Sequence, residues 1–225
     1  MTRRLAAVFA VVAAMLSLSA CFGPEEEYTL PEKVVDFEKL FTVNCSGCHG
    51  KDGRGGAARP LNDALYQALV KKDRLVEVIA KGVKGTAMPA SAKSAGGMLT
   101  DQQIGILADE MQKRWSKQAE FANATLPSYD GPLGEAARGE AAFQIFCGSC
   151  HGPDGKGIAK KAGTVVNPAY LALVTDQALR LTVIAGRPDL GMPDFRARVP
   201  DRVMQPQEIA DVVAWLASHR EKKTP

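Results

Sequence analysis

The sequence predicts an all-α fold made of two similar domains in tandem, and two observations support this prediction. Apolar residues recur three and four positions apart, as at Val34, Phe37 and Phe41, whereas no alternating run is long enough for a convincing strand. A group of residues in the first half also recurs in the second half at a constant offset of 102 positions. A chain of 225 residues can hold two domains of about 100 residues each.

The repeat consists of one ordered set of residues in each half. The first set is Phe41, Cys45, Cys48, His49, Gly50, Asp52, Gly53 and Gly55, and the second is Phe143, Cys147, Cys150, His151, Gly152, Asp154, Gly155 and Gly157. Further along, each half has a glycine six residues before a Met-Pro pair: Gly82 with Met88-Pro89, and Gly186 with Met192-Pro193. Residues 99–111 and 204–216 then match as helix-like stretches, so we interpret the chain as a tandem duplication.

Composition changes along the chain predict the domain boundaries. We expect the first domain to span residues 33–118 and the second to span residues 133–225. Residues 119–132 between them are rich in Asn, Pro, Ser, Asp and Gly, which is typical of a linker. Residues 21–32 contain two prolines and three consecutive glutamates, and we expect them to form a polar tether. Thr100 with Gln103 predicts a capping box, and Pro206 predicts the first turn of the final helix.

Residues 1–20 have the features of an export signal. Arg3 and Arg4 precede an uncharged apolar run over residues 5–18, which is too short for a comfortable membrane span. Small residues then lead into Cys21, and this junction resembles the lipobox of bacterial lipoproteins, in which the cysteine is acylated. We therefore predict a periplasmic or otherwise extracytoplasmic protein that is held at a membrane by lipid on Cys21. A plain secretory signal or a short anchor is the alternative.

Charge and composition narrow the classes of partner. The formal net charge is only +3, and no basic stripe is interleaved with aromatic residues, so we do not expect nucleic acid as a partner. Aromatic residues make up 6% of the chain, which is few for filling two small cores. A bound macrocycle would supply the missing apolar bulk.

Four of the five cysteines lie in two C-x-x-C-H motifs, which are the signature of covalent haem attachment. Two thiols one helical turn apart reach two vinyl-derived carbons of a porphyrin, and the histidine that follows faces the iron. We expect two haem c groups, held by Cys45 and Cys48 with His49, and by Cys147 and Cys150 with His151. A four-thiolate zinc site and a thioredoxin-type dithiol are the alternatives. They are less favoured because the pairs lie 102 residues apart and no βαβ pattern surrounds either motif.

Methionines are the candidates for the second axial ligand of each iron. Met88 lies 39 residues after His49 and Met192 lies 41 residues after His151, so the duplication places both at similar distances. The remaining histidine, His219, lies in the last turn of the final helix, where we expect it to face the helix dipole or solvent. The other candidates are assigned as follows: Met98 is a fallback ligand for the first haem, and Met111 and Met204 are core residues.

Each half resembles a class I cytochrome c over residues 33–115 and 137–220. In that family a small residue of the first helix packs against an aromatic residue of the last. Gly139 with Trp215 fits this pattern in the second half, whereas the first half has Phe37 and Glu110 at these positions. The resemblance therefore implies a compensated contact with altered packing in the first half.

The resemblance also implies that a loop carbonyl orients each proximal imidazole, usually near a proline. Pro60 is the marker in the first half. Only Pro168, which follows a longer loop containing lysines, is present in the second half.

These features predict an electron carrier and not an enzyme. Two haems with His/Met ligation suit single-electron transfer in a respiratory or related chain, between redox partner proteins that the sequence does not identify. The alternatives are a haem-containing subunit of a larger respiratory or other oxidoreductase complex, and a dihaem peroxidase-type enzyme. An acidic partner would be guided by lysines near the first haem edge, namely Lys71, Lys72, Lys81, Lys84 and Lys93.

Overall fold

The computed structural model describes residues 28–221, so the predicted signal segment and Cys21 lie outside the described residues. The chain divides into two compact units, Met1–Val34 and Val35–Pro225. Of the first unit, the described part contains one short 3-10 helix, η1, at Pro31–Lys33. The second unit contains both copies of the repeat, and everything below concerns this unit.

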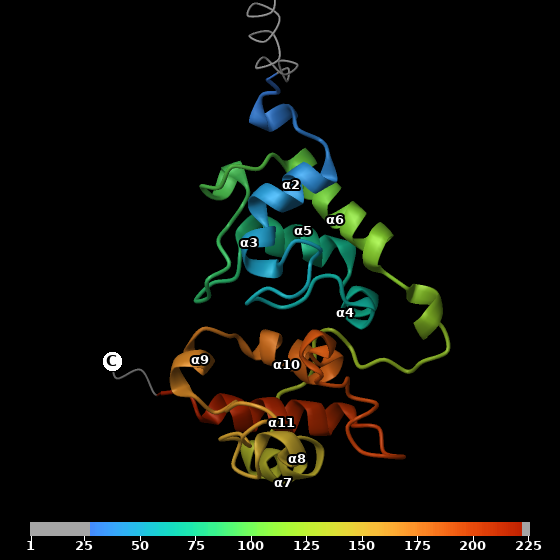
Figure 1. The fold of residues 1–225 in the computed structure, drawn as a ribbon, viewed down its shortest axis with the longest axis vertical. Coiled ribbons are helices and arrows are strands. Elements are labelled where there is room, and N and C mark those ends of the chain that lie inside the picture. The colour runs from blue at the N-terminus through green and yellow to red at the C-terminus, as the bar shows by residue number, and fades with distance from the viewer. Residues whose placement is uncertain (1–27, 222–225) are drawn as a thin grey trace, which may run out of the picture. The chain divides into compact units, whose positions relative to one another are not determined.

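Both copies are built from helices in the same order (Figure 1). The first copy comprises α2 Phe37–Asn44, α3 Ser46–His49, α4 Ala64–Leu69, α5 Lys72–Lys81, η2 Lys93–Ala95 and α6 Asp101–Trp115. The second comprises α7 Ala136–Phe146, α8 Gly148–His151, α9 Pro168–Ala172, α10 Asp176–Ala185, η4 Pro188–Leu190 and α11 Pro206–Ser218, and η3 Gln118–Phe121 lies between the copies. Only isolated β-bridges interrupt the helices and loops of residues 28–221. The predicted all-α tandem fold is confirmed.

Local side-chain hydrogen bonds define where several helices begin. Thr100 and Gln103 form the predicted capping box at the start of α6, each side chain bonding the other residue's backbone N–H. Pro206 occupies the first turn of α11, where its missing N–H leaves no helical bond unmade. These features explain why the last helix of each copy begins where the pattern predicts.

Each copy has its own apolar core around its last helix. In the first copy the most deeply buried apolar residues of α6 are Ile104, Leu107, Ala108 and Met111. In the second copy Ile209, Val212 and Met204 are buried just as deeply, within or just before α11. Met111 and Met204 are therefore core residues, as predicted. Among the described helices, none combines the length and the apolarity that crossing a bilayer demands.

The segment that joins the copies is bonded to the second copy. The Arg180 side chain of α10 donates to the carbonyl oxygen of Ser128 at 3.0 Å. Gln177, one turn earlier, donates to the carbonyl oxygen of Tyr129 at 2.8 Å. The connection is thus held along one face of α10, although its composition resembles that of a free linker.

Candidate haem sites

The C-x-x-C-H motif of each copy straddles the end of one helix and the start of a short second one. Cys45 closes α2 by donating its N–H to the Phe41 carbonyl, and its φ of −125° breaks the helix before α3 begins. Cys48 then lies one turn further along α3, with its N–H 3.2 Å from the Cys45 carbonyl oxygen. Cys147 and Cys150 repeat this arrangement at the junction of α7 and α8. Each pair of thiols is therefore spaced by one helical turn.

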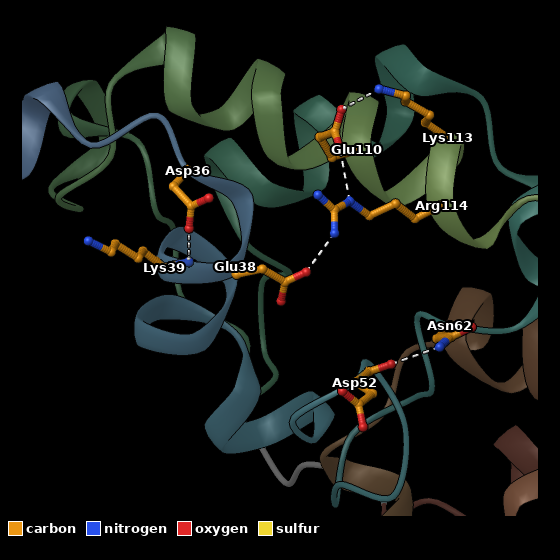
Figure 2. Close-up of polar contacts among 8 residues, drawn as sticks. All are labelled: Asp36, Glu38, Lys39, Asp52, Asn62, Glu110, Lys113 and Arg114. Atoms are coloured by element: carbon orange, nitrogen blue, oxygen red, sulfur yellow. Dashed lines mark hydrogen bonds and ion pairs between the residues drawn. The ribbon is translucent and has the colours of Figure 1, made fainter.

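A glycine ends each of these short helices and turns the chain back. Gly50 has a φ of +83°, and a Cβ there would lie 1.9 Å from the Arg54 carbonyl oxygen, so only glycine fits. The returning loop is braced by Asn62, whose side chain donates to the Asp52 carbonyl at 2.9 Å (Figure 2). This turn directs the loop past the imidazole of His49.

A loop carbonyl orients each imidazole. His49 Nδ1 lies 2.7 Å from the carbonyl oxygen of Arg59, the residue before Pro60, so the expected marker is correct in the first copy. His151 Nδ1 lies 3.0 Å from the carbonyl oxygen of Gly163. Pro168 does not mark that carbonyl, because the longer loop of the second copy brings an earlier residue to the ring. When Nδ1 donates to a carbonyl, Nε2 keeps its lone pair for a metal.

The Met-Pro pairs lie in loops that fold back onto the end of α5 or α10. The Val83 N–H donates to the Met88 carbonyl at 3.0 Å, and the Arg187 N–H donates to the Met192 carbonyl at 3.0 Å. A Cβ on Gly82 would lie 2.6 Å from the Met88 carbonyl oxygen, and one on Gly186 would lie 2.5 Å from that of Met192. This close approach explains why a glycine stands six residues before each methionine. Both methionines are half-buried.

The other candidate ligands lie in different settings. Met98 is 75% exposed, and alanine, not glycine, stands six residues before it. His219 follows α11 directly, with Nδ1 2.9 Å from the Trp215 carbonyl oxygen and its ring against the indole at 4.6 Å. His219 therefore interacts with the carbonyl end of its own helix, as the sequence predicts.

The donor groups of each copy fit a covalently attached haem. All four motif cysteines are free thiols, and none of residues 28–221 belongs to a cluster of three or more His, Cys, Asp or Glu that would hold a metal ion. Burial, with a smaller contribution from neighbouring Cys48, raises the pKa of Cys45 to about 11, whereas a redox-active dithiol needs a lowered thiol pKa. Burial lowers the pKa of His49 below its usual value, which favours the neutral imidazole that binds iron.

Trp115 is a residue of the first copy that the repeat comparison missed. The expected partner of Phe37 was Glu110, which instead bonds Arg114 and Lys113 on the surface (Figure 2). The Trp115 ring meets Phe37 at 5.8 Å and Phe41 at 5.3 Å between ring centroids. The compensated contact is therefore present, but its aromatic partner comes from five residues further along α6. The sequence does carry a signal for this contact, because Trp115 ends the amphipathic stretch that forms α6.

Arg198 is a second residue that sequence reasoning missed, because a lone arginine in a loop carries no pattern. Its guanidinium lies beside the Cys147 thiol and donates to the Val183 carbonyl at 2.7 Å. Its buried Nε has no hydrogen-bond partner among the described residues. Burial raises the pKa of Cys147, and Arg198 partly opposes this shift. The second site thus has a guanidinium next to the first cysteine of its C-x-x-C-H motif.

The family of the chain follows from comparison with known proteins. The family model described as cytochrome c oxidase, cbb3-type, subunit III matches residues 32–109 and 134–216, one segment in each copy. Subunit CcoP of the cbb3-type cytochrome c oxidase of Rubrivivax gelatinosus is 32% identical over 57% of this chain and 37% of its own length. Subunit FixP of that oxidase type in Sinorhizobium medicae is 32% identical over 52% of this chain and 38% of its own length.

The match to these relatives is partial in length. The aligned region spans less than two fifths of each of these two curated proteins. Among solved structures, a chain of the Kuenenia stuttgartiensis reducing HAO-like protein complex is 17% identical, with a TM-score of 0.45 over 86% of this chain and 100% of that chain. The family model, in contrast, covers both copies and contains both C-x-x-C-H motifs. The chain belongs to the cbb3-type cytochrome c oxidase subunit III family and is a c-type cytochrome with two tandem haem c domains.

Proposed function

We propose that this protein transfers single electrons through two haems whose irons each have one histidine and one methionine ligand. Cys45 and Cys48 form the thioether links of the first haem, and Cys147 and Cys150 form those of the second. The axial ligands are His49 with Met88, and His151 with Met192. The main support is the imidazole geometry of both copies, since each ring donates from Nδ1 to a carbonyl and keeps Nε2 for iron.

The residues around each haem would keep the iron environment nearly constant during electron transfer. When bound, a haem supplies a one-electron couple, and a thioether ligand favours its ferrous form. The Arg59 and Gly163 carbonyls fix the imidazoles, and the backbone bonds of the Met-Pro loops fix the methionines. Because little has to rearrange, this arrangement suits outer-sphere transfer better than substrate chemistry.

The ligand assignment is tested with Met88→Ala, Met192→Ala and the control Met98→Ala. Purified protein should contain two haems per chain by the pyridine haemochrome assay. Each of the first two variants should lose about half of the near-infrared sulfur-to-iron band of the oxidised protein and gain a high-spin signal. Met98→Ala should keep the full band, because that side chain is 75% exposed. A full band in Met88→Ala or Met192→Ala would remove that methionine from the ligand set.

The proposed setting is the outer face of a bacterial membrane, with the protein anchored by lipid on Cys21. The lipobox-like junction and the polar residues 21–32 support a tethered domain. Replacing Cys21 with alanine should release the haem protein into the soluble extracytoplasmic fraction. Recovery of the variant in the membrane fraction would contradict the lipid anchor.

We further propose that the protein works as a subunit of a respiratory complex. Its curated relatives are oxidase subunits, and in this chain the lysines proposed to guide a partner are all exposed. Two of them are already paired, Lys72 with Asp109 and Lys81 with Glu77, which leaves Lys71, Lys84 and Lys93 as the stronger candidates. Purification in mild detergent should recover the protein with a fixed partner. Recovery of the dihaem chain alone would favour a free carrier.

A further inference from the structure

Arg59 contacts both copies of the repeat with different parts of the same residue. Its carbonyl oxygen accepts the hydrogen bond from His49 Nδ1 at 2.7 Å. Its guanidinium donates to α10 of the second copy, reaching the Ala178 carbonyl oxygen at 3.0 Å and the Thr182 hydroxyl oxygen at 2.7 Å. One residue thus connects the proximal imidazole of the first site to a helix of the second copy.

The guanidinium of Arg59 is held by several neighbours. The Thr182 hydroxyl donates its own proton to the Ala178 carbonyl at 2.8 Å, so its lone pairs remain available to the guanidinium. The Arg59 guanidinium also lies over the Tyr66 ring, with its central carbon 5.5 Å from the ring centroid and so within cation–π range. Pro60 follows Arg59 and restricts its backbone to extended conformations. A fixed side chain on a restricted backbone fixes the position of the carbonyl.

Within residues 28–221, the second copy has no equivalent of this connection. The carbonyl that accepts from His151 belongs to Gly163, which has no side chain to reach another element. That bond is also longer, at 3.0 Å compared with 2.7 Å for His49. The two imidazoles therefore have the same kind of partner, but only the first partner is anchored from outside its own copy.

We propose that Arg59 is a positioning residue for the first haem and acts through the second copy, because α10 holds the carbonyl that orients His49. The proposal rests on haem binding by the first copy, as proposed above. The carbonyl bond raises the basicity of the imidazole and fixes its plane. The redox properties of the first haem then depend on the contact between the copies, whereas those of the second haem do not.

Thr182→Val is the most informative test, because it removes one acceptor in the second copy and leaves every charge and every residue of the first copy unchanged. Arg59→Met removes the whole connection, and Arg59→Lys restores a cation with one donor group in place of the fork. Arg114→Met is the matched arginine control, since Arg114 pairs with Glu38 and Glu110 of the first copy. Haem stoichiometry, the exchange rate of each proximal imidazole N–H by NMR of the reduced protein, and a potential titration resolved by haem are measured for each variant.

In Thr182→Val and Arg59→Met we expect exchange of the His49 N–H to accelerate by about tenfold, by analogy with the smaller losses of metal affinity that follow when a partner of a ligating histidine is mutated. Exchange of the His151 N–H should stay unchanged. In Arg59→Met the potential of the first haem should also fall, since a nearby cation is lost, by about tenfold in the one-electron equilibrium constant, or about 59 mV. Arg59→Lys should recover most of that potential, and Arg114→Met should resemble the wild type.

Two results would overturn the role of Arg59. The first is unchanged His49 exchange in both Thr182→Val and Arg59→Met, with two haems bound. The second is equal acceleration of N–H exchange at His49 and His151, which would indicate that the substitution loosens the whole fold. If Arg59→Met loses haem, Thr182→Val decides alone. A wild-type protein with fewer than two haems would instead contradict the proposed function.

Discussion

The two copies pack their first and last helices together in different ways. In the second copy α7 crosses α11 at Gly139, where a Cβ would lie 2.0 Å from the Asp211 carbonyl oxygen, so the two backbones are nearly in contact. Trp215 then covers Phe143 with ring centroids 4.3 Å apart. In the first copy Phe37 takes the place of the glycine, and its ring meets that of Trp115 on α6 edge-on at 5.8 Å between centroids.

The polar contacts at these two crossings differ as much as the apolar ones. In the second copy the buried Asp211 carboxylate accepts from the Arg138 side chain at 2.8 Å and from the Glu135 N–H at 2.8 Å. In the first copy Arg114 joins Glu38 to Glu110 on the surface (Figure 2). Duplicated units can therefore keep a tryptophan on the last helix while changing how bulky the first helix is at the crossing and whether the charges there are buried.

The largest effect is expected for Phe37→Ala, which removes one ring from the aromatic cluster that Phe37 forms with Phe41 and Trp115. Phe37 is only 4% exposed and contacts both Phe41 and Trp115, so its removal leaves a cavity. The free energy of unfolding of the first copy should fall by about 4 kcal/mol. Denaturant unfolding with hydrogen exchange resolved by helix would measure this loss. Equal loss of protection in α7 and α11 would show that the two copies do not unfold separately.

A smaller loss is expected for Gly139→Ala in the second copy. The new methyl group meets backbone atoms of α11, so the helices must separate, and we expect destabilisation of about 2 kcal/mol. Gly105→Ala in α6 is the matched control, because no atom lies within 4 Å of the added Cβ. That control should stabilise its helix by up to about 1 kcal/mol through helix propensity. If both variants behave alike, close packing at Gly139 is not the cause.

Asp211→Asn should destabilise the second copy by about 1 to 2 kcal/mol, because buried donors lose their charged acceptor. The hydrogen bond from Arg138 contributes most to holding the pKa of Asp211 below its ordinary value. The stabilisation by this carboxylate is therefore complete above the unfolded pKa of about 3.9, and it is lost as the pH falls through the folded pKa. Unfolding midpoints measured from pH 7 to pH 2 should depend less on pH in the variant. An unchanged pH dependence would contradict this role of Asp211.

The smallest effect is expected for Glu38→Gln, which breaks the exposed connection between α2 and α6. The carboxylate is 65% exposed and Arg114 keeps its partner Glu110, so we expect no measurable change in the unfolding midpoint. Thermal unfolding at low and high salt checks this expectation. If Glu38→Gln destabilised the protein as much as Asp211→Asn, burial would not explain why the two ion pairs differ in their contribution to stability.

Much of the fold and of the candidate sites follows from local patterns. The capping box at Thr100 and the glycines at positions 50 and 82 depend on neighbours a few residues away. The two C-x-x-C-H motifs are equally local, because one helical turn brings both thiols to the same side. A duplicated sequence makes these signals stronger, since the motifs and the glycines appear once in each copy and in the same order.

The repeat in the sequence did not predict which residues fill equivalent places in the two copies. Matching residues 99–111 to residues 204–216 placed Glu110 opposite Phe37, but the aromatic partner is Trp115 at the end of α6. The marker Pro168 likewise lies five residues past Gly163, whose carbonyl meets His151. When a loop changes length, or when a different residue of a helix makes a contact, the same role is filled in the two copies by residues that do not align.

The sequence by itself determined the all-α repeat, the two haem c motifs and the core methionines, because each depends on spacing along one short segment. Only the tertiary structure decided which aromatic residue fills the first crossing, that Arg59 reaches α10, and that Arg198 lies beside Cys147. Those contacts join residues that are far apart in the chain. Such contacts depend on how complete helices pack, and local periodicity does not encode that packing.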